Sequence, residues 1–248
     1  MKSKQMHLLS LLLQANLPED LPLPAGFVTY AFAALENNLD RYEPDERLVS
    51  LIAETLPLIP GIHFSWADRI AFPANKWAVM WPGEHYKLLA ALVQTLQPKK
   101  VFEIGTYSGM SCLAMKEYLT NGAHITTYDV CPWDELAIDP TQCPFQARDF
   151  DDKLTQKVQD LTVPSVQKAE KPLWEDADFI FIDAAKDGKM EYVFIDFLDS
   201  IAFNSPPLVI FDDIKLLCML DIWNSIKHPK WDISSFGHWS GTGIVHWV

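Results

Sequence analysis

The chain has 248 residues, of which 49% are hydrophobic and 21% charged, a balance typical of a globular protein and unlike a disordered or fibrous one. Its length suits one α/β domain with additional segments. Twenty Lys and Arg residues stand against 33 Asp and Glu residues, giving a net charge of −13. Binding to nucleic acid or to an anionic membrane surface needs clustered basic side chains, so we expect neither partner.

The first 75 residues predict a helical N-terminal extension or cap. Apolar residues recur at helical spacing over 5–15, 27–38 and 46–56, and prolines separate these stretches. The N-terminal leucine-rich stretch faintly resembles a signal peptide, but it is short and lacks a cleavage site, so an amphipathic helix is the preferred interpretation. We expect the main domain to cover residues 76–248.

From residue 76 onward, short apolar segments alternate with helical patterns. Strands are expected at 101–104, 124–128, 154–158, 179–182, 208–211, 231–236 and 243–248. Helices are expected at 84–96, 108–119, 190–201 and 216–226, and a long loop at 131–152. This alternation is typical of a mostly parallel, doubly wound α/β sheet with helices on both faces, to which the last hairpin adds an antiparallel C-terminal strand.

Acidic residues stand at the carboxyl ends of the expected strands. They are Glu103, Asp129, Asp183, Asp212 and Asp213. Ligands bind beyond this edge in open α/β sheets, so the topology gathers five carboxylates at one rim. One or two acids would suit the general polarity of loops, whereas five favour a binding site.

The first expected strand leads into a loop with two glycines. Gly105 permits a tight turn close to a ligand, and Gly109 lets the next helix approach the strand. The bulky Tyr107 stands where a dinucleotide-binding loop has its middle glycine. Glu103 would repel phosphate and attract an ammonium group, and Asp129 stands where a carboxylate accepts ribose hydroxyls. Together these residues predict a nucleoside ligand without a diphosphate.

The loop resembles the first motif of class I S-adenosylmethionine-dependent methyltransferases, and especially of the cation-dependent O-methyltransferases of the catechol and caffeoyl-CoA type. Their acid-x-Gly-x-Tyr-x-Gly-x-Ser motif is matched by Glu103, Gly105, Tyr107, Gly109 and Ser111. The resemblance implies that Glu103 holds the methionine amino group and that Ser111 helps with the methionine carboxylate. Tyr107 would line the methionine end of the pocket.

The same resemblance extends the cofactor site to later strand ends. It implies that Asp129 binds the ribose and that Asp160 contacts the adenine, with Asp183 also bordering the cofactor. It also implies that Met80 and Trp81 belong to a segment lying over the cofactor.

Three carboxylates, those of Asp183, Asp212 and Asp213, follow two consecutive strands and would repel one another unless a cation compensates. A hard divalent ion with oxygen ligands is the expected solution. Lys186, three residues after Asp183, is placed to reach the same rim, where a neighbouring cation would lower its pKa and suit it to act as a base. The alternative for Lys186 is a surface salt bridge with a nearby acid.

The resemblance implies Asp183, Asp212 and Asp213 as metal ligands, and Lys186 together with Asp183 as the catalytic residues. Asp213 stands where the family usually has asparagine.

The sequence therefore predicts a Rossmann-like S-adenosylmethionine-dependent O-methyltransferase assisted by a divalent cation, with magnesium as the first choice. The expected acceptor is a small molecule with adjacent oxygens, such as a catechol or a diol. Two alternatives stay open: a metal-independent small-molecule methyltransferase, and a non-catalytic methyltransferase-like binding protein. We expect a cytoplasmic protein, and the sequence leaves open whether the extension caps the active site, forms a homodimer or does both.

Overall fold

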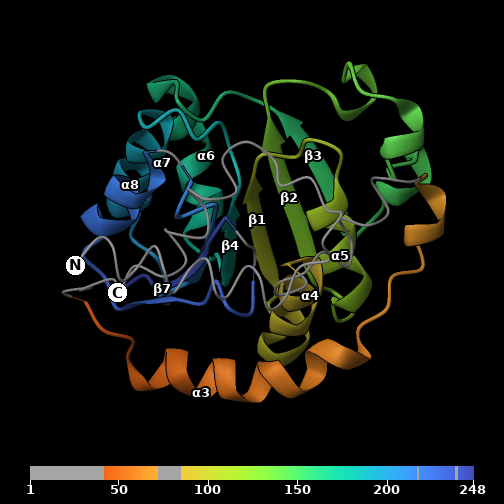
Figure 1. Cartoon of the computed structure of the whole chain (residues 1–248). Helices are drawn as coiled ribbons and strands as arrows, with labels where there is room; N and C mark the ends of the chain where they lie inside the picture. Colours follow the sequence, from red (N-terminus) through yellow and green to blue (C-terminus); the bar gives the residue numbers. More distant parts are fainter. Residues whose placement is uncertain (1–41, 72–84, 217, 238–239) are drawn as a thin grey trace, which may run out of the picture.

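The computed structural model describes residues 42–71, 85–216, 218–237 and 240–248. These residues form a seven-stranded sheet of order β3-β2-β1-β4-β5-β7-β6 (Figure 1). The strands are β1 (Lys100–Ile104), β2 (His124–Asp129), β3 (Leu154–Val158), β4 (Phe179–Ile182), β5 (Leu208–Asp212), β6 (Lys230–Asp232) and β7 (Thr242–His246). β1 to β5 pair in parallel, and β7 runs antiparallel to both β5 and β6. The predicted Rossmann-like sheet with an antiparallel C-terminal strand is confirmed.

Helices cover both faces of this sheet (Figure 1). One face carries α3 (Glu46–Thr55), α4 (His85–Leu96) and α5 (Met110–Tyr118). The other face carries α6 (Pro164–Trp174), α7 (Met190–Ser200) and α8 (Met219–Ser225). Because parallel strands buried on both faces need apolar residues at every position, the short continuous apolar runs of the sequence fit this arrangement.

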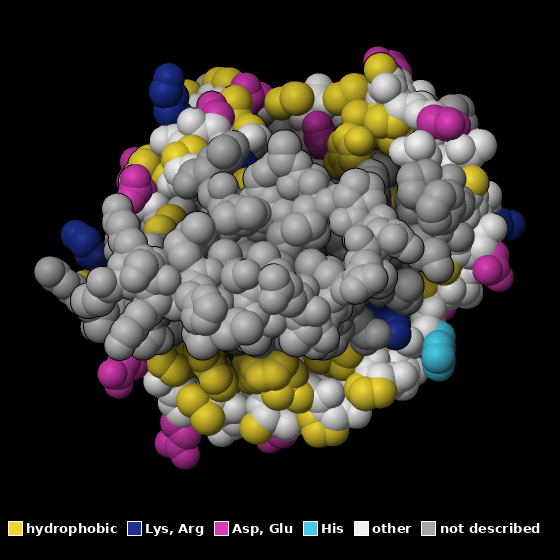
Figure 2. All heavy atoms as spheres, viewed as in Figure 1, with side chains coloured by type: hydrophobic (Ala, Val, Ile, Leu, Met, Phe, Trp, Pro, Cys, Tyr) yellow, Lys and Arg dark blue, Asp and Glu magenta, His cyan; other side chains and the backbone are white. Residues whose placement is uncertain are grey.

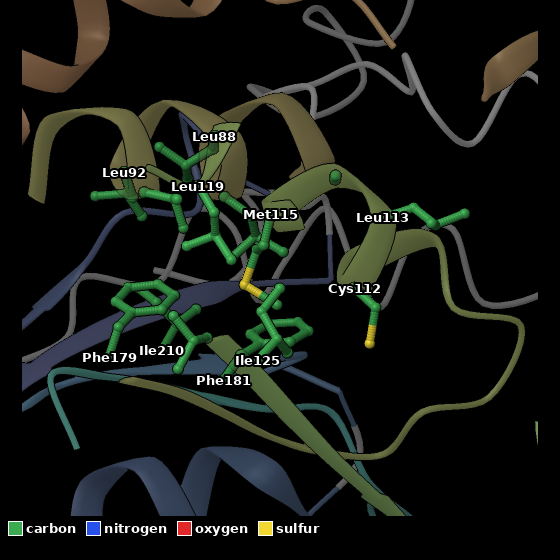
Figure 3. Close-up of a cluster of buried hydrophobic side chains, with 14 of the residues drawn as sticks. Leu88, Leu92, Cys112, Leu113, Met115, Leu119, Ile125, Phe179, Phe181 and Ile210 are labelled. Atoms are coloured by element: carbon green, nitrogen blue, oxygen red, sulfur yellow. The ribbon is translucent and has the colours of Figure 1, made fainter. Parts of the chain in front are cut away.

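Two hydrophobic clusters hold the layers together, and successive residues of one strand enter different clusters. In β4, Phe179 and Phe181 face α4 and α5, whereas Ile180 and Ile182 face the helices of the opposite layer. Figure 3 shows the first cluster, in which Leu88 and Leu92 of α4 lie over the side chains of β4 and its neighbours. This alternation follows from the two-residue period of a strand.

The described part of the N-terminal extension joins the main core. α3 confirms the helix expected over 46–56, and its buried residues pack in the same cluster as α4. Its N-cap, Asp45, accepts a hydrogen bond from Leu48 N at 3.0 Å and lies 2.5 Å from Nδ1 of His246, at the end of β7. Nη1 of Arg47 lies 2.8 Å from the other ring nitrogen of His246. The beginning of α3 is therefore fastened to the last strand.

Several expectations fall outside the described residues. These are the helices over 5–15 and 27–38, and the placement of Met80 and Trp81. The division of the chain at residue 75 stays a prediction.

The sequence analysis missed α6 altogether. Only two α6 residues are buried, Glu170 and Trp174, and Pro172 interrupts the pattern, so the helix has little apolar periodicity to detect. Besides the packing of Trp174, a polar contact attaches this helix, because the hydroxyl of Tyr128 donates to Glu170 at 2.7 Å. Lys157 also pairs with Glu170, at 2.5 Å.

Other elements differ from expectation in their extent. The 131–152 loop contains three short 3₁₀ helices: η4 (Trp133–Glu135), η5 (Pro140–Gln142) and η6 (Ala147–Asp149). Two more, η1 (Leu56–Gly61) and η2 (Ala67–Arg69), follow α3. α8 begins three residues later than expected, at Met219, and β6 ends at Asp232 rather than at residue 236.

Among the described residues, no helix combines the length and the apolar character needed to cross a bilayer. On the part of the surface that Figure 2 shows in colour, Lys and Arg side chains lie apart from one another, and acidic side chains are dispersed around the outline.

Replacing Trp174 tests how α6 is held. Its indole is fully buried and stacks on Phe102 with ring centroids 4.5 Å apart. Trp174→Ala should lower the free energy of unfolding by about 3–5 kcal/mol, because it removes a large side chain and leaves a cavity. The matched control is Leu173→Ala, since Leu173 is 47% exposed on the same helix. Urea unfolding measures both variants, and equal losses for the two would contradict this packing.

Candidate active site

The carboxyl ends of β4 and β5 bring three of the predicted acids together. Ile182 pairs with Phe211 in the sheet, so Asp183 and Asp212 follow neighbouring positions. One carboxylate oxygen from each of Asp183, Asp212 and Asp213 lies within 4.8 Å of the others. The spacing of the sequence motifs predicted this convergence, and we refer to these three residues as the acidic triad.

Lys186 lies between members of the acidic triad. Its Nζ contacts the carboxylate of Asp183 and lies 2.9 Å from Oδ2 of Asp213. Burial opposes the charged form of the lysine, but the carboxylates of Asp183, Asp213 and Asp212 outweigh it and raise the pKa of Lys186. The carboxylates of the protein therefore raise the pKa of Lys186, whereas a bound cation was expected to lower it. The salt bridge with a nearby acid, which was the alternative for Lys186, is present.

Asp212 is the most deeply buried member of the acidic triad. Burial raises the pKa of Asp212 well above its usual range, and the charges of Asp183 and Asp213 act in the same direction. If all three acids are ionised, one ammonium against three carboxylates leaves the cluster with a charge of −2.

Two further residues border the acidic triad and were not assigned to it from the sequence. Nδ1 of the buried His85, at the start of α4, lies 3.7 Å from Oδ1 of Asp212. The hydroxyl of Ser240 donates to the carboxylate of Asp213. Both come from segments remote in sequence, and no residue spacing could have indicated them.

The two glycines of the loop after β1 both have left-handed backbone conformations. Gly105 has φ +100°, and a Cβ there would lie 2.0 Å from the backbone oxygen of Asp183. The predicted tight turn is therefore present, and it touches the acidic triad. Gly109 has φ +80°, and its Cβ would lie 2.0 Å from the ring of Phe145. The 131–152 loop thus covers Gly109, which the sequence analysis had linked to helix packing.

Glu103 is fully buried at the end of β1. Its carboxylate accepts hydrogen bonds from the hydroxyls of Ser111 and Thr127, each at 2.5 Å, and from the thiol of Cys112. Burial raises the pKa of Glu103 from its usual value near 4.5 to about 7. Ser111, predicted to bind the methionine carboxylate, is thus bonded to Glu103, and the two residues form one buried polar cluster.

Asp129 fastens the glycine loop. Its Oδ2 accepts from the backbone N–H groups of Thr106 and Tyr107, each at 3.0 Å, and its Oδ1 accepts from Cys131 N at 3.1 Å. Gln159 N donates to the backbone oxygen of Asp129 at 2.8 Å, which joins the ends of β2 and β3.

Residues further out on this rim are more exposed. Asp160 accepts from the backbone N and the hydroxyl of Thr162, at 2.8 and 2.6 Å, within its own turn. Tyr107 is 54% exposed and has φ +41°. Val130, directly after Asp129, is 70% exposed. The exposed side chain of Val130 is available to pack against the ring of a bound ligand, and the sequence analysis did not consider this residue.

Comparison with protein families identifies the family of the chain. The family model described as O-methyltransferase matches residues 71–199, more than half of the chain. The chain belongs to the O-methyltransferase family. The resemblance stated from the glycine loop and the acidic motifs is confirmed at this level, and no curated protein matches the chain.

Solved structures support the fold of this O-methyltransferase. One is an SAH-bound methyltransferase, PaMTH1, from Podospora anserina, with 18% sequence identity and a TM-score of 0.52, covering 94% of this chain and 100% of that one. Another is a putative O-methyltransferase from Klebsiella pneumoniae, with 19% identity and a TM-score of 0.51, covering 82% of this chain and 99% of that one.

The buried carboxyl of Glu103 predicts a specific pH dependence of stability. Its folded pKa is raised, so its contribution is fully present below about pH 4.5 and is lost as the pH rises to about 7. Relative to Glu103→Gln, the unfolding free energy of the wild type should fall by on the order of 3 kcal/mol over this interval. Urea unfolding at several pH values measures the difference, and a pH-independent difference would contradict a buried, perturbed carboxyl.

Proposed function

We propose that this O-methyltransferase moves the methyl group of S-adenosylmethionine to a hydroxyl of a small molecule with adjacent oxygens, assisted by a divalent cation, with magnesium as the expected ion. Glu103, Gly105, Tyr107, Gly109, Ser111, Asp129, Asp160 and Asp183 are the proposed cofactor-binding residues. Asp183, Asp212 and Asp213 are the proposed metal ligands, and Lys186 and Asp183 the proposed catalytic residues.

One observation carries the proposal: the glycine loop and the acidic triad touch. The space for a side chain at Gly105 is filled by the backbone of Asp183. A group bound at the glycine loop would therefore adjoin a group bound at the acidic triad. Such adjacency is what transfer between two bound molecules requires, because it converts an encounter into an oriented reaction.

The rim of β1 and β2 has features that suit a nucleoside with a cationic amino-acid tail. The ionised form of Glu103 would be stabilised by a nearby ammonium group, which would offset the burial that raises its pKa. Asp129 uses one oxygen for two loop N–H groups and the other for a single N–H, so the second oxygen has capacity for a hydroxyl. The SAH-bound Podospora methyltransferase, which shares this fold, lends further support.

The acidic triad has the chemistry of a hard-cation site. All three side chains offer carboxylate oxygens, the donors preferred by Mg²⁺, Mn²⁺ and Ca²⁺. The surplus negative charge and the raised pKa of Asp212 mean that a divalent ion would relieve repulsion already present among these residues. A bound divalent ion would supply Lewis acidity, lowering the pKa of a coordinated hydroxyl.

The proposed role of Lys186 is to accept, at Nζ, the proton that the acceptor hydroxyl loses. The ammonium is held beside Asp183 and Asp213, at the point where the glycine loop meets the acidic triad. To accept a proton, Nζ must first lose one, and its pairing with two carboxylates disfavours that loss. A cation bound by Asp183 and Asp213 would offset their charge and so favour the loss of a proton from Nζ.

The two alternatives from the sequence assign less to the site. In a metal-independent enzyme the three converging carboxylates would hold no ion, and in a non-catalytic protein Lys186 would serve only as their ion-pair partner. Metal binding tests the first alternative and turnover tests the second. The proposal keeps the expectations of a cytoplasmic location and a small-molecule acceptor, without a nucleic-acid or membrane partner, and it leaves a homodimer open.

Asp129→Ala tests the cofactor site. The substitution removes charge-assisted bonds worth roughly 1.5–3 kcal/mol, so affinity for S-adenosylmethionine should weaken by about one to two decades. Calorimetry measures the affinity, with the exposed Asp134→Ala as the matched control. Unchanged affinity would remove Asp129 from the site, and a preference of the wild type for NAD would contradict the proposed cofactor.

Magnesium titration tests the metal site. Wild-type protein should bind Mg²⁺ in calorimetry, and Asp212→Asn should weaken binding because an anionic ligand becomes neutral. Affinity for S-adenosylmethionine should change little, since Asp212 is not one of the proposed cofactor-binding residues. With 3,4-dihydroxybenzoic acid as acceptor probe, a chelator should abolish formation of S-adenosylhomocysteine. Full turnover in chelator would instead support the metal-independent alternative.

A further inference from the structure

The loop that carries Lys186 has an unusual backbone. Lys186 has φ +53°, in the left-handed region that residues other than glycine rarely adopt, and Gly188 has φ +74°. The chain reverses here between the end of β4 and the start of α7. A left-handed lysine needs external support, because Cβ and the backbone crowd each other in this conformation.

We propose that Glu191 is a positioning residue: its buried carboxylate fixes the backbone of Lys186 and so aims the Lys186 ammonium at the acidic triad. This inference rests on the proposed function only in naming Lys186 as the catalytic lysine. The contacts that carry it belong to the chain itself.

Both carboxylate oxygens of Glu191 bind the Lys186 loop. Oε1 accepts from Lys186 N at 2.5 Å, and Oε2 accepts from Gly188 N at 3.1 Å. Glu191 is 1% exposed, although it lies in the first turn of α7. The backbone N and the Cβ of Lys186 are both bonded to its Cα. Fixing the position of Lys186 N therefore restricts the direction of the Cα–Cβ bond and of the side chain that follows it.

A second contact holds the loop from α8. The thiol of Cys218 lies 3.6 Å from the backbone oxygen of Lys186. A Cβ at Gly188 would lie 2.6 Å from the same sulfur, so the loop passes close to Cys218. The peptide groups of Lys186 are thus held on the N–H side by Glu191 and approached on the oxygen side by Cys218.

Helix capping does not account for Glu191, because Asp187 already performs that task. Oδ1 of the exposed Asp187 accepts from Lys189 N at 2.8 Å and from Met190 N at 2.9 Å, at the beginning of α7. Glu191 reaches backward from the helix to residues that precede its N-cap, Lys189. The two acids therefore have different roles: Asp187 caps the helix, and Glu191 binds the Lys186 loop.

Amine labelling followed by mass spectrometry tests the proposal without any acceptor. The ratio of acetylation at Lys186 to acetylation at the exposed Lys189 reports whether Lys186 still lies against the acidic triad. Glu191→Ala should raise this ratio severalfold, and Glu191→Gln, which keeps one acceptor oxygen, should raise it less. The matched control, Asp187→Ala, should lower the melting temperature through loss of the cap while leaving the ratio at its wild-type value.

Kinetics and metal binding give the second readout. With S-adenosylmethionine, Mg²⁺ and 3,4-dihydroxybenzoic acid, Glu191→Ala should lower kcat by about 10- to 100-fold through misplacement of Lys186. The KM for S-adenosylmethionine should stay near its wild-type value, because Glu191 touches none of the proposed cofactor-binding residues. The affinity for Mg²⁺ should be retained or should rise, because a displaced Lys186 ammonium no longer competes for Asp183 and Asp213.

The proposal fails if folded Glu191→Ala keeps the wild-type labelling ratio, or if Asp187→Ala changes the ratio equally. Should Glu191→Ala not fold, Glu191→Gln is judged by the same criterion. If wild-type protein binds neither S-adenosylmethionine nor Mg²⁺, the proposed function fails, and the labelling comparison still decides the role of Glu191.

Discussion

The close approach of Gly105 to the backbone of Asp183 is the constraint on which the site depends. The end of β1 meets the end of β4 so closely that any side chain at position 105 would collide with a backbone oxygen. This meeting lies where the sheet order changes direction, between β1 and β4, the point at which open α/β sheets place their ligands. Both the glycine loop and the acidic triad take their positions from it.

The rest of the fold stabilises a site whose backbone conformations and buried charges are unfavourable in themselves. Within the described residues, positive φ angles away from glycine occur at Tyr107, Lys186 and Asp213, all at this rim, and at Gln97 elsewhere. Asp212 is buried there, and its burial and the charges of Asp183 and Asp213 raise its pKa. Two apolar clusters, one on each face of the sheet, stabilise the fold and so offset the free energy of these unfavourable local conformations.

The sequence was most informative where the signal is local. Apolar runs located β1 to β5, and acids at the strand ends predicted the convergence of Asp183, Asp212 and Asp213, because the carboxyl ends of parallel strands meet at one edge. It was least informative where contacts join distant segments. α6 is anchored through Tyr128 and Glu170, and Phe145 covers Gly109 from the long loop. His85 approaches Asp212 from a helix that precedes β1, and none of these contacts leaves a periodic pattern.

The strand order also divides the site into two separately encoded halves. Of the eight proposed cofactor-binding residues, all but Asp183 lie in β1 or β2 or follow β1 or β3, whereas the acidic triad and its lysine lie at or after the ends of β4 and β5. The two halves occupy different stretches of the chain, and they meet where Gly105 contacts the backbone of Asp183. Under the proposed function, segments after β4 and β5 can diverge and change which molecules are accepted, while the segments after β1 to β3 stay as they are. In such an architecture a lineage can exchange acceptors without rebuilding the site of the methyl donor.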